Sequence, residues 1–516
     1  MTQTRSDTAT SIAATPADPD KIPAHVWRTA GVVVFGAIMG MLDTSLVNIG
    51  LRTIGADLGA SLATIQWVAS GYLLALGVSL TVCGWLARRV GVTRLWLWAL
   101  IAFTLTSTAC AFAPDAGWLI GLRILQGLAA GLMIPAGQTI LGQAAGPQRM
   151  GRVMGVVGIA VVGAPAIGPT IGGLMLAHWS WEWLFLINIP FGLAGLALGL
   201  RYLPRSSPTA TQPLDVLGLV LAGGGVSAVV YGLSEVGVTG SVTSLPVWLP
   251  VVLGLAGLAG FLVRALRNTL PLLDIRLFAV PGFRVATSAG FFAGGAMFGV
   301  MVLLPLYFQE LHGAGLVRTG VNLLGFGLGG VVMLPLGGKL TDRFGGGSVA
   351  VLGNLAVAAT VLPLAFLPVD ANGFLVQSLL FAAGLATAVG AMPLVSAAYA
   401  AVRREQLPDA TALVNIMQRV GGAVAVAMVA VILSRATASG WAPVSGYHLA
   451  FAALAALSVV AAVASTVLRR QQRVTAETRP SMERGYAAAQ VRSLSAGQVL
   501  MIRSAGTPLS RARCAP

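Results

Sequence analysis

The chain has 516 residues, of which 56% are hydrophobic and only 9% are charged. A soluble domain carries about 25% charged residues, so this composition excludes an ordinary water-soluble protein and indicates a chain that lies in the lipid bilayer. The net charge of +15 does not indicate nucleic-acid binding, because the basic residues lie in loops between apolar segments, as the positive-inside rule describes.

The predicted elements are membrane-spanning helices, each of which needs about 20 mostly apolar residues. Residues 1–27 are a polar segment with no cleavable signal peptide, and we expect a cytoplasmic tail there. Twelve or thirteen spans are alternatives, but an odd number would put the two basic tails on opposite sides. The sequence therefore predicts an all-α integral membrane protein with fourteen spans, at residues 28–50, 66–87, 94–113, 117–140, 152–176, 183–203, 214–234, 246–266, 285–309, 319–340, 348–368, 373–400, 411–434 and 447–468.

The basic residues predict the orientation of these spans. If the N-terminus is cytoplasmic, the outer loops hold only Arg52, Arg318 and Arg435, and the other loop arginines lie inside. We therefore expect a multi-pass protein of the inner (plasma) membrane with both termini in the cytoplasm. The Arg-rich segment 469–516 is expected to be a solvated cytoplasmic tail, or one that touches anionic headgroups.

A short repeat divides the chain. The pattern G-x-L-x-x-R-x-G follows the second span and occurs again after the tenth, whereas two equal halves of six spans would place the second copy after the eighth. This indicates a six-helix bundle over 28–203, two additional helices within 204–284, and a second six-helix bundle over 285–468. The alternative is a pair of ordinary basic loops. The predicted gating-loop residues are Gly84, Arg88, Arg89, Gly91, Gly338, Asp342, Arg343 and Gly345.

Polar residues within the spans are the candidates for chemistry. Asp43 lies inside an apolar run, where a charge is costly and usually functional. Burial disfavours the charged form of a carboxyl group, so we expect Asp43 to exchange protons or to pair with a cationic substrate. A structural hydrogen bond to Thr44 or Asn48 is the alternative, although Asn48 is better placed to bond another helix. Arg123 and Gln126 stand three residues apart on one helix face and need a partner or an aqueous path.

Two further groups of residues complete the candidate site. The fifth span contains a Gly- and Pro-rich stretch that predicts a bending seam or a close helix contact: Gly163, Pro165, Gly168, Pro169, Gly172 and Gly173. The second half contributes Gln309, Glu310, Asn415 and Arg419, of which Glu310 is expected near a cavity mouth and Arg419 is expected to reach the cytoplasmic interface.

Several segments together resemble one transporter group. They are Leu42–Ile49, the R-x-x-Q-G of residues 123–127, the stretch 163–173, the W-x-W-x-F-x-I-N-x-P-x-G of residues 181–192, Leu304–Gln309 and Asn415–Gly422. The chain resembles the EmrB/QacA branch of the major facilitator superfamily, the drug:proton antiporters with fourteen spans. The resemblance implies a role for Arg123 in proton transfer and for the fifth-span motif in controlling leak. Arg88 stands where that family usually has Asp in the first loop motif, whereas the second copy keeps Asp342.

These observations lead to one leading hypothesis and two alternatives. We expect a proton-coupled antiporter that exports small amphiphilic or cationic organic compounds by alternating access. The first alternative is an exporter of an endogenous metabolite, lipid or siderophore, and the second is a non-transporting membrane sensor or enzyme. The sequence predicts no enzymatic activity, no cofactor and no metal. The expected partners are the bilayer, protons and small organic substrates; nucleic acid and a periplasmic adaptor are not predicted.

Overall fold

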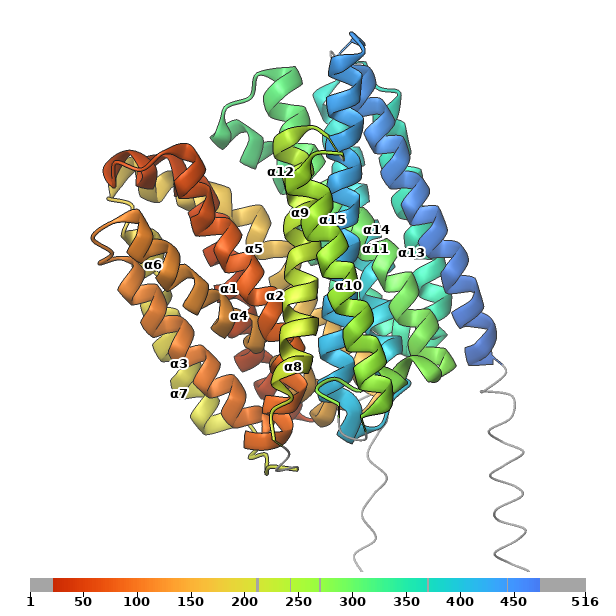
Figure 1. Cartoon of the computed structure of the whole chain (residues 1–516). Coiled ribbons are helices and arrows are strands. Elements are labelled where there is room, and N and C mark those ends of the chain that lie inside the picture. The colour runs from red at the N-terminus through yellow and green to blue at the C-terminus, as the bar shows by residue number, and fades with distance from the viewer. Residues whose placement is uncertain are drawn as a thin grey trace, which may run out of the picture.

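All regular elements in the described part of the chain are helices (Figure 1). The computed structural model describes residues 22–473 except 210–212, 242, 269–270, 369–370 and 443. The longer elements are α1 (Ala24–Asp57), α2 (Leu62–Val90), α3 (Val92–Cys110), α4 (Ala116–Ala145), α5 (Met150–His178), α7 (Asn188–Tyr202), α9 (Gly225–Thr239), α10 (Leu245–Arg267), α11 (Pro281–Leu306), α12 (Leu316–Phe344), α13 (Gly346–Val361), α14 (Gly373–Ala400), α15 (Leu407–Ala438) and a last helix, Val444–Arg473. The shorter ones are α6 (Trp183–Leu186), α8 (Val216–Leu219), the π-helical turns η2 (Val220–Gly224) and η4 (Tyr307–Leu311), and the 3₁₀ turns η1 (Pro147–Arg149), η3 (Ile275–Ala279), η5 (Leu362–Ala365) and η6 (Arg404–Gln406).

Thirteen helical stretches of the described part are long and apolar enough to cross a membrane. The sequence predicted fourteen spans. Helix α5 is a further 29-residue helix, but the side chains of residues 159–162, 165, 166 and 169 within it lie outside the described part. The predicted tails fall largely outside as well, at residues 1–21 and 474–516.

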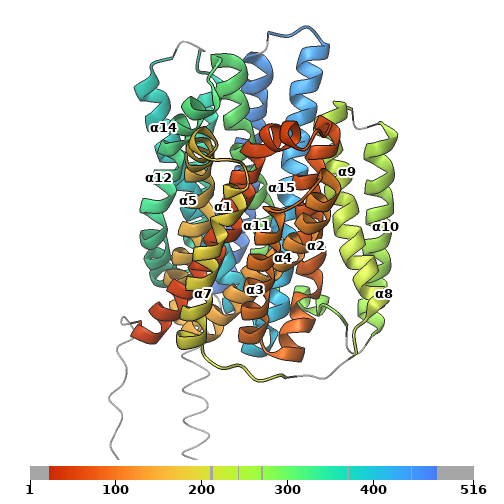
Figure 2. The same cartoon turned by 90° about the vertical axis from the view of Figure 1, so that its left-hand side faces the viewer.

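The helices of the first and second halves of the chain gather on opposite sides of the molecule (Figure 1). Helices α1–α7, red to yellow, lie on one side, and α11 to the last helix, green to blue, lie on the other. The hairpin of α9 and α10 contacts α2 from the first group and α15 from the second, and Figure 2 shows it at the edge of the molecule. Close packing between α9 and α10 depends on glycine, because a Cβ at Gly254 would lie 2.7 Å from the carbonyl oxygen of Gly225.

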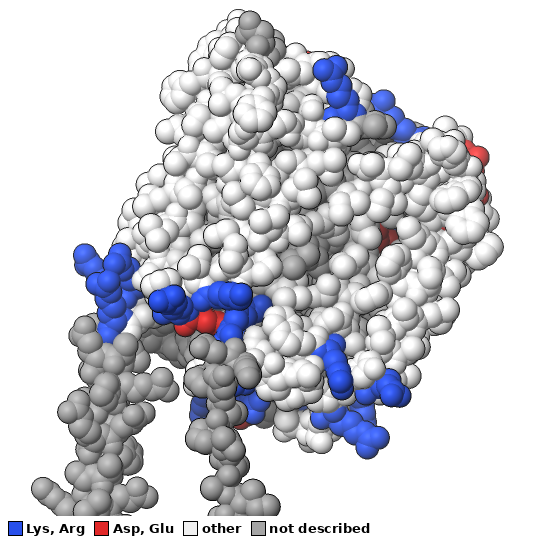
Figure 3. Space-filling model, turned by 180° about the vertical axis from the view of Figure 1, so that it is seen from behind, with Lys and Arg blue, Asp and Glu red and all other residues white. Residues whose placement is uncertain are grey.

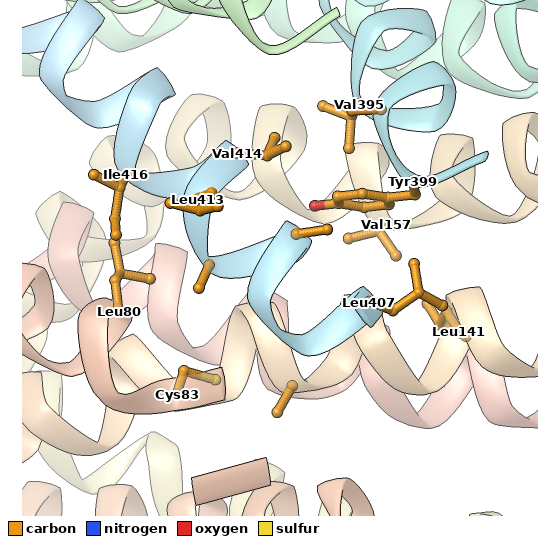
Figure 4. Packing of buried hydrophobic residues seen from close by; sticks show 14 of the residues in the cluster. Leu80, Cys83, Leu141, Val157, Val395, Tyr399, Leu407, Leu413, Val414 and Ile416 are labelled. Atoms are coloured by element: carbon orange, nitrogen blue, oxygen red, sulfur yellow. The ribbon is translucent and has the colours of Figure 1, made fainter. Parts of the chain in front are cut away.

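The two groups pack tightly at one end, where α2, α4, α12 and α14 finish and α5 and α15 begin. There α5 contacts α12 and α14, and α15 contacts α2 and α4. A single buried apolar cluster crosses this boundary. Figure 4 shows ten of its labelled members: Leu80, Cys83, Leu141, Val157, Val395, Tyr399, Leu407, Leu413, Val414 and Ile416. We call this the basic end, because the arginine-rich connections between helices lie there. Towards the opposite end, a cavity separates α1 from α11, η4 and α12.

Candidate functional site

Asp43 lies near the middle of α1 and is fully buried. Its Oδ2 accepts a hydrogen bond from Nη1 of Arg123 at 2.5 Å, and the two groups form an ion pair. Its Oδ1 accepts from Nε2 of Gln126 at 2.9 Å and from Nδ2 of Asn188 at 3.1 Å. The structure thus brings together three of the predicted site residues, Asp43, Arg123 and Gln126. Thr44, which the alternative reading paired with Asp43, instead donates to the carbonyl oxygen of Gly40.

The guanidinium of Arg123 is held from several helices. Nη1 also donates to Oε1 of Gln126 at 2.7 Å, and Nε donates to the carbonyl oxygen of Val68 on α2 at 3.3 Å. Its central carbon lies 4.1 Å from the ring centroid of Tyr72, a cation–π contact. Because an Arg cannot shed its proton inside a membrane, these contacts together compensate a permanent charge.

The local sequence explains how these side chains meet. Arg123 and Gln126 share one face of α4, and α4 lies close to α2 because Gly127 has no side chain: a Cβ there would lie 2.3 Å from the carbonyl oxygen of Tyr72. Asn188 is the first residue of α7, after the break that follows α6. Its Nδ2 also donates to Oγ of Ser107 at 2.9 Å, and that hydroxyl donates to the carbonyl oxygen of Phe185 at 3.0 Å. Both N–H groups of the Asn188 side-chain amide therefore donate hydrogen bonds, and both carboxylate oxygens of Asp43 accept them.

Two predictions about polar residues within the spans were wrong. Asn48 makes no hydrogen bond to another described residue; it is exposed and lines a cavity instead. Arg419 does not reach the basic end, because α15 begins at Leu407 and a rise of 1.5 Å per residue puts Arg419 about 18 Å along the helix. It is half-buried and makes no hydrogen bond or ion pair with another described residue. It lies within electrostatic range of Tyr72.

The cavity has a volume of about 750 Å³ and separates α1 from α11, η4 and α12, in the half of the molecule away from the basic end. Ser45, Asn48 and Arg52 line it from α1, and Gln309 lines it from η4. The rest of the lining is mostly apolar. Glu310, expected near a cavity mouth, is exposed and directly follows Gln309 but is not among the lining residues. It accepts a hydrogen bond from the hydroxyl of Tyr447 on the last helix.

At the basic end, the first copy of the repeat joins the two halves of the chain. Gly84, Arg88 and Arg89 lie in the last turns of α2 rather than in a loop, and the chain turns at Gly91, where φ is +88°. Arg88 forms an ion pair with Asp409 in the first turn of α15, and its Nη2 donates to the carbonyl oxygen of Leu272 at 3.3 Å. The first loop motif of the EmrB/QacA branch usually has Asp where this chain has Arg88. Here the cation Arg88 therefore stands at that position, and Asp409 of α15 supplies the carboxylate that pairs with it.

The second copy makes the matching contact with the charges reversed. Gly338, Asp342 and Arg343 lie in the last turns of α12, before Gly345 at a φ of +81°. Oδ1 of Asp342 accepts from the backbone N–H of Gly151 at 2.8 Å, and Oδ2 accepts from Nε of Arg152 at 2.8 Å. A carboxylate at the N-terminus of a helix is also stabilised by the helix dipole. The end of α2 in the first half thus pairs with the beginning of α15 in the second half, and the end of α12 in the second half pairs with the beginning of α5 in the first.

The Gly-rich stretch of α5 lies between α1 and α12. A Cβ at Gly168 would lie 2.2 Å from Oγ of Ser45, and one at Gly172 would lie 3.1 Å from Leu46, so this part packs closely on α1. A Cβ at Gly163 would lie 3.2 Å from the side chain of Val331 on α12. The side chains of Pro165 and Pro169 lie outside the described residues, and Gly173 is half-buried. The predicted motif therefore lies where α5 meets helices of both groups.

A polar cluster inside the basic end joins α4 to α14 and α15. Oε1 of Gln138 accepts from the hydroxyl of Tyr399 at 2.9 Å and from Nδ2 of Asn415 at 2.7 Å. The hydroxyl groups of Thr139 and Thr411 lie 2.9 Å apart. Asn415, a predicted second-half candidate, thus belongs to the contact between the groups and not to the cavity.

Several residues of the site were not predicted from the sequence. Asp409 could have been noticed as an acid next to Pro408 at the start of an apolar run, a typical helix N-terminus. Asn188 was noticed only as part of a motif. Ser107 and Tyr72 carry no sequence signal, because neither is charged and neither belongs to one of the recognised motifs. In the described part, no group of three or more His, Cys, Asp or Glu side chains could hold a metal ion.

Comparison with known proteins assigns the family. The sequence profile of the Major Facilitator Superfamily matches residues 33–426, and a second match covers residues 286–510. The chain belongs to the major facilitator superfamily. Two solved members share the fold: the human organic anion transporter MFSD10 (TETRAN) at 15% identity and the proton:xylose symporter XylE at 14%, each with a TM-score of 0.59. The match to MFSD10 covers 86% of this chain and 100% of MFSD10, and the match to XylE covers 85% of this chain and 95% of XylE.

Relatives within the major facilitator superfamily are named for drug and antibiotic resistance. A multidrug resistance protein B homolog of Mycobacterium tuberculosis is 33% identical over 81% of this chain and 78% of its own length. The tetracenomycin C resistance and export protein of Streptomyces glaucescens is 33% identical, over 73% and 69%. The lincomycin resistance protein of Bacillus subtilis is 31% identical, over 78% and 84%. The chain is therefore a multi-pass membrane transporter of a family that includes efflux proteins, which places it in the plasma membrane.

Proposed function

We propose that this chain is a proton-coupled antiporter that exports small amphiphilic or cationic organic compounds by alternating access. The observation that carries the proposal is the buried ion pair of Asp43 and Arg123. Ser45, which lines the cavity, follows Asp43 by two residues and so lies about 3 Å further along α1, on the opposite face of the helix. Asp43 is the carboxylate that lies deepest in the predicted spans. A group placed there at such energetic cost is usually functional.

The pair supplies a reversible charge. Protonation of Asp43 would neutralise it and leave Arg123 with Gln126, the carbonyl oxygen of Val68 and the Tyr72 ring as its remaining contacts. Because an uncompensated buried charge is unfavourable, the protonated protein would favour a different helix arrangement. Loss of the proton would restore the pair. Through this exchange Asp43 would couple proton movement to the transition between conformations.

The proposed architecture is two six-helix bundles of residues 28–203 and 285–468, with two additional helices from 204–284. With α5 as the fourteenth span, both termini lie on the cytoplasmic side of the inner membrane, consistent with the arginine distribution. The packing at the basic end and the cavity at the other then correspond to an outward-facing conformation. The ion pairs of Arg88 with Asp409 and of Arg152 with Asp342 would open when the protein faces inward.

The cavity favours an amphiphilic cargo, because its apolar lining is interrupted by a few polar groups, including Asn48 and Gln309. The second candidate is an exporter of an endogenous metabolite, lipid or siderophore. Arg52 favours an anionic or zwitterionic member of that class, because it is a permanent cation in the lining of the cavity. Relatives named for tetracenomycin C resistance and export and for methylenomycin A resistance are consistent with either cargo.

Proton movement during transport tests this proposal. Everted vesicles containing the protein are energised so that the lumen becomes acidic, and ethidium is then added while a lumenal pH dye is followed. An antiporter takes up ethidium and releases protons, so the lumenal pH rises; vesicles without the protein show no change. Uptake without proton release would contradict proton coupling. If none of a panel of cationic dyes moves, but an anionic amphiphile does, the metabolite exporter becomes the better account.

A further inference from the structure

A second, separate groove opens on the side of the molecule formed by the second half of the chain. Its volume is about 1030 Å³, and it is lined by α12, α13, α14 and the last helix. The walls are apolar and include Phe344, Leu352, Ala356 and Leu385. Leu352 is 69% exposed and Phe344 is 57% exposed, so the groove faces the surroundings of the protein. It shares no lining residue with the cavity beside α1.

One end of the groove is basic. Arg469, Gln472 and Arg473, from the end of the last helix, line it there, and the lining includes no Asp or Glu. Nε of Arg469 is buried and has no hydrogen-bond partner among the described residues. Such an orphaned buried donor is unfavourable unless a ligand or water supplies an acceptor. Figure 3 shows most of the basic side chains in view at the lower end of the molecule and a few near the upper edge, with a largely uncharged surface between them.

The basic rim is held in place by close backbone packing. The N–H of Gly347 donates to Oε1 of Gln472 at 3.0 Å, and a Cβ at Gly347 would lie 2.5 Å from the backbone nitrogen of Arg469. The start of α13 and the end of the last helix are therefore locked together. These contacts fix the backbone that carries Arg469 and Gln472 beside the start of α13, so this part of the groove end is preorganised.

The length of the groove suits an acyl chain. From Ser348 to Thr360 its wall runs along α13 for about 18 Å, at 1.5 Å per residue. One leaflet of the hydrocarbon core is about 15 Å thick. A chain lying in the groove would thus span a leaflet while the charged rim lies at the headgroup level.

We propose that this groove is a binding site for one anionic phospholipid of the leaflet at the basic end. An acyl chain lies against α12, α13 and α14, and the phosphate accepts hydrogen bonds from Arg469 and Arg473. Guanidinium groups bind phosphate strongly, and the absence of acidic side chains from the lining favours a lipid with net negative charge. The proposal does not depend on which compound the protein exports.

Native mass spectrometry of the full chain in detergent tests the proposal, with dioleoyl phosphatidylglycerol and dioleoyl phosphatidylcholine titrated as probes. Arg469→Gln/Arg473→Gln removes the charged rim, and Ala356→Phe fills the groove but leaves the charges. Arg470→Gln is the matched control, because Arg470 is exposed on the same helix and does not line the groove. Melting temperatures measured without added lipid show whether each variant is folded.

We expect the wild type and Arg470→Gln to bind phosphatidylglycerol more tightly than phosphatidylcholine. The double variant loses about 10- to 30-fold of that affinity, since each arginine near a lipid headgroup contributes about 1 kcal/mol. Ala356→Phe weakens binding of both lipids. The proposal is overturned if the double variant keeps the preference, or if glycerol 3-phosphate alone competes fully, which would indicate a phosphate site. It is also overturned if binding appears only after residues 474–516 are removed, because that segment would then be the occupant.

Discussion

The ion pair of Asp43 and Arg123 is the centre of the proposed proton exchange. Both side chains are almost fully buried, with 0% and 1% of their surface exposed. Every polar atom of Asp43 has a partner, from α1's neighbours α4 and α7. Removing one partner of a buried pair leaves an uncompensated charge and costs about 3–5 kcal/mol, whereas removing both can cost little.

This asymmetry gives a prediction for stability. Arg123→Gln alone should lower the melting temperature in detergent strongly, because Asp43 then keeps an unpaired charge. The double variant Asp43→Asn/Arg123→Gln should be more stable than Arg123→Gln, although it carries one more substitution. A double-mutant cycle of melting temperatures measures this. Additive losses, with the double variant the least stable, would show that the two side chains act independently.

At this scale the sequence predicted the charged residues but not their neighbours. Asp43 and Arg123 are recognisable because charge is rare inside apolar runs. Asn188 and Ser107 are not, because their contribution depends on how α3 and α7 lie against α1. Asn48 was expected to bond another helix because of its spacing from Asp43. It lines the cavity, because α1 faces the cavity at that position, and spacing within one helix does not reveal what the helix faces.

At the scale of elements, the ends of α2 and α12 hold the beginnings of α15 and α5. The two contacts have the same placement and opposite polarity, Arg88 with Asp409 and Asp342 with Arg152. The sequence repeat predicted the two matching ends. It could not predict the partners, because Asp409 and Arg152 lie far away in the chain.

A charge exchange tests whether the first contact matters for transport. Arg88→Asp alone places two carboxylates side by side and should lower transport at least about tenfold, because a like-charge pair costs several kcal/mol. Asp409→Arg alone should do the same. The combined variant Arg88→Asp/Asp409→Arg rebuilds the pair and should recover most of the activity. Dye efflux from cells, with surface expression measured in parallel, provides the test. No recovery in the combined variant would show that the individual residues matter and not their attraction.

At the scale of the whole molecule, the two groups of helices pack together at the basic end, and the cavity lies towards the opposite end. This is the conformation that we propose to be outward-facing. The apolar runs were enough to predict a helical membrane protein with most of its spans. Which end is closed could not be predicted, because it depends on contacts between helices of the two groups, such as Gln138 with Asn415.

A disulfide across the closed end tests whether it must open. The hydroxyl groups of Thr139 and Thr411 lie 2.9 Å apart, so the two side chains meet across the boundary between α4 and α15, and cysteines at these positions are the candidates for a crosslink. In a background with Cys83, Cys110 and Cys514 replaced, Thr139→Cys/Thr411→Cys should lose transport on oxidation and regain it on reduction. Each single cysteine variant serves as a control that oxidation should not affect. Full transport with the crosslink formed would mean that this end does not open.

The central claim is that Asp43 exchanges the transported proton, and one measurement tests it most directly. Wild type, Asp43→Asn and Glu405→Gln, which changes an exposed carboxylate, are reconstituted into liposomes in the same orientation. A proton gradient is imposed, and accumulation of a dye that the wild type transports is measured with and without the gradient. We predict that the gradient drives accumulation by the wild type and by Glu405→Gln, but not by folded Asp43→Asn, which should only equilibrate the dye. Gradient-driven accumulation by Asp43→Asn at the wild-type rate would contradict it and place the proton path elsewhere.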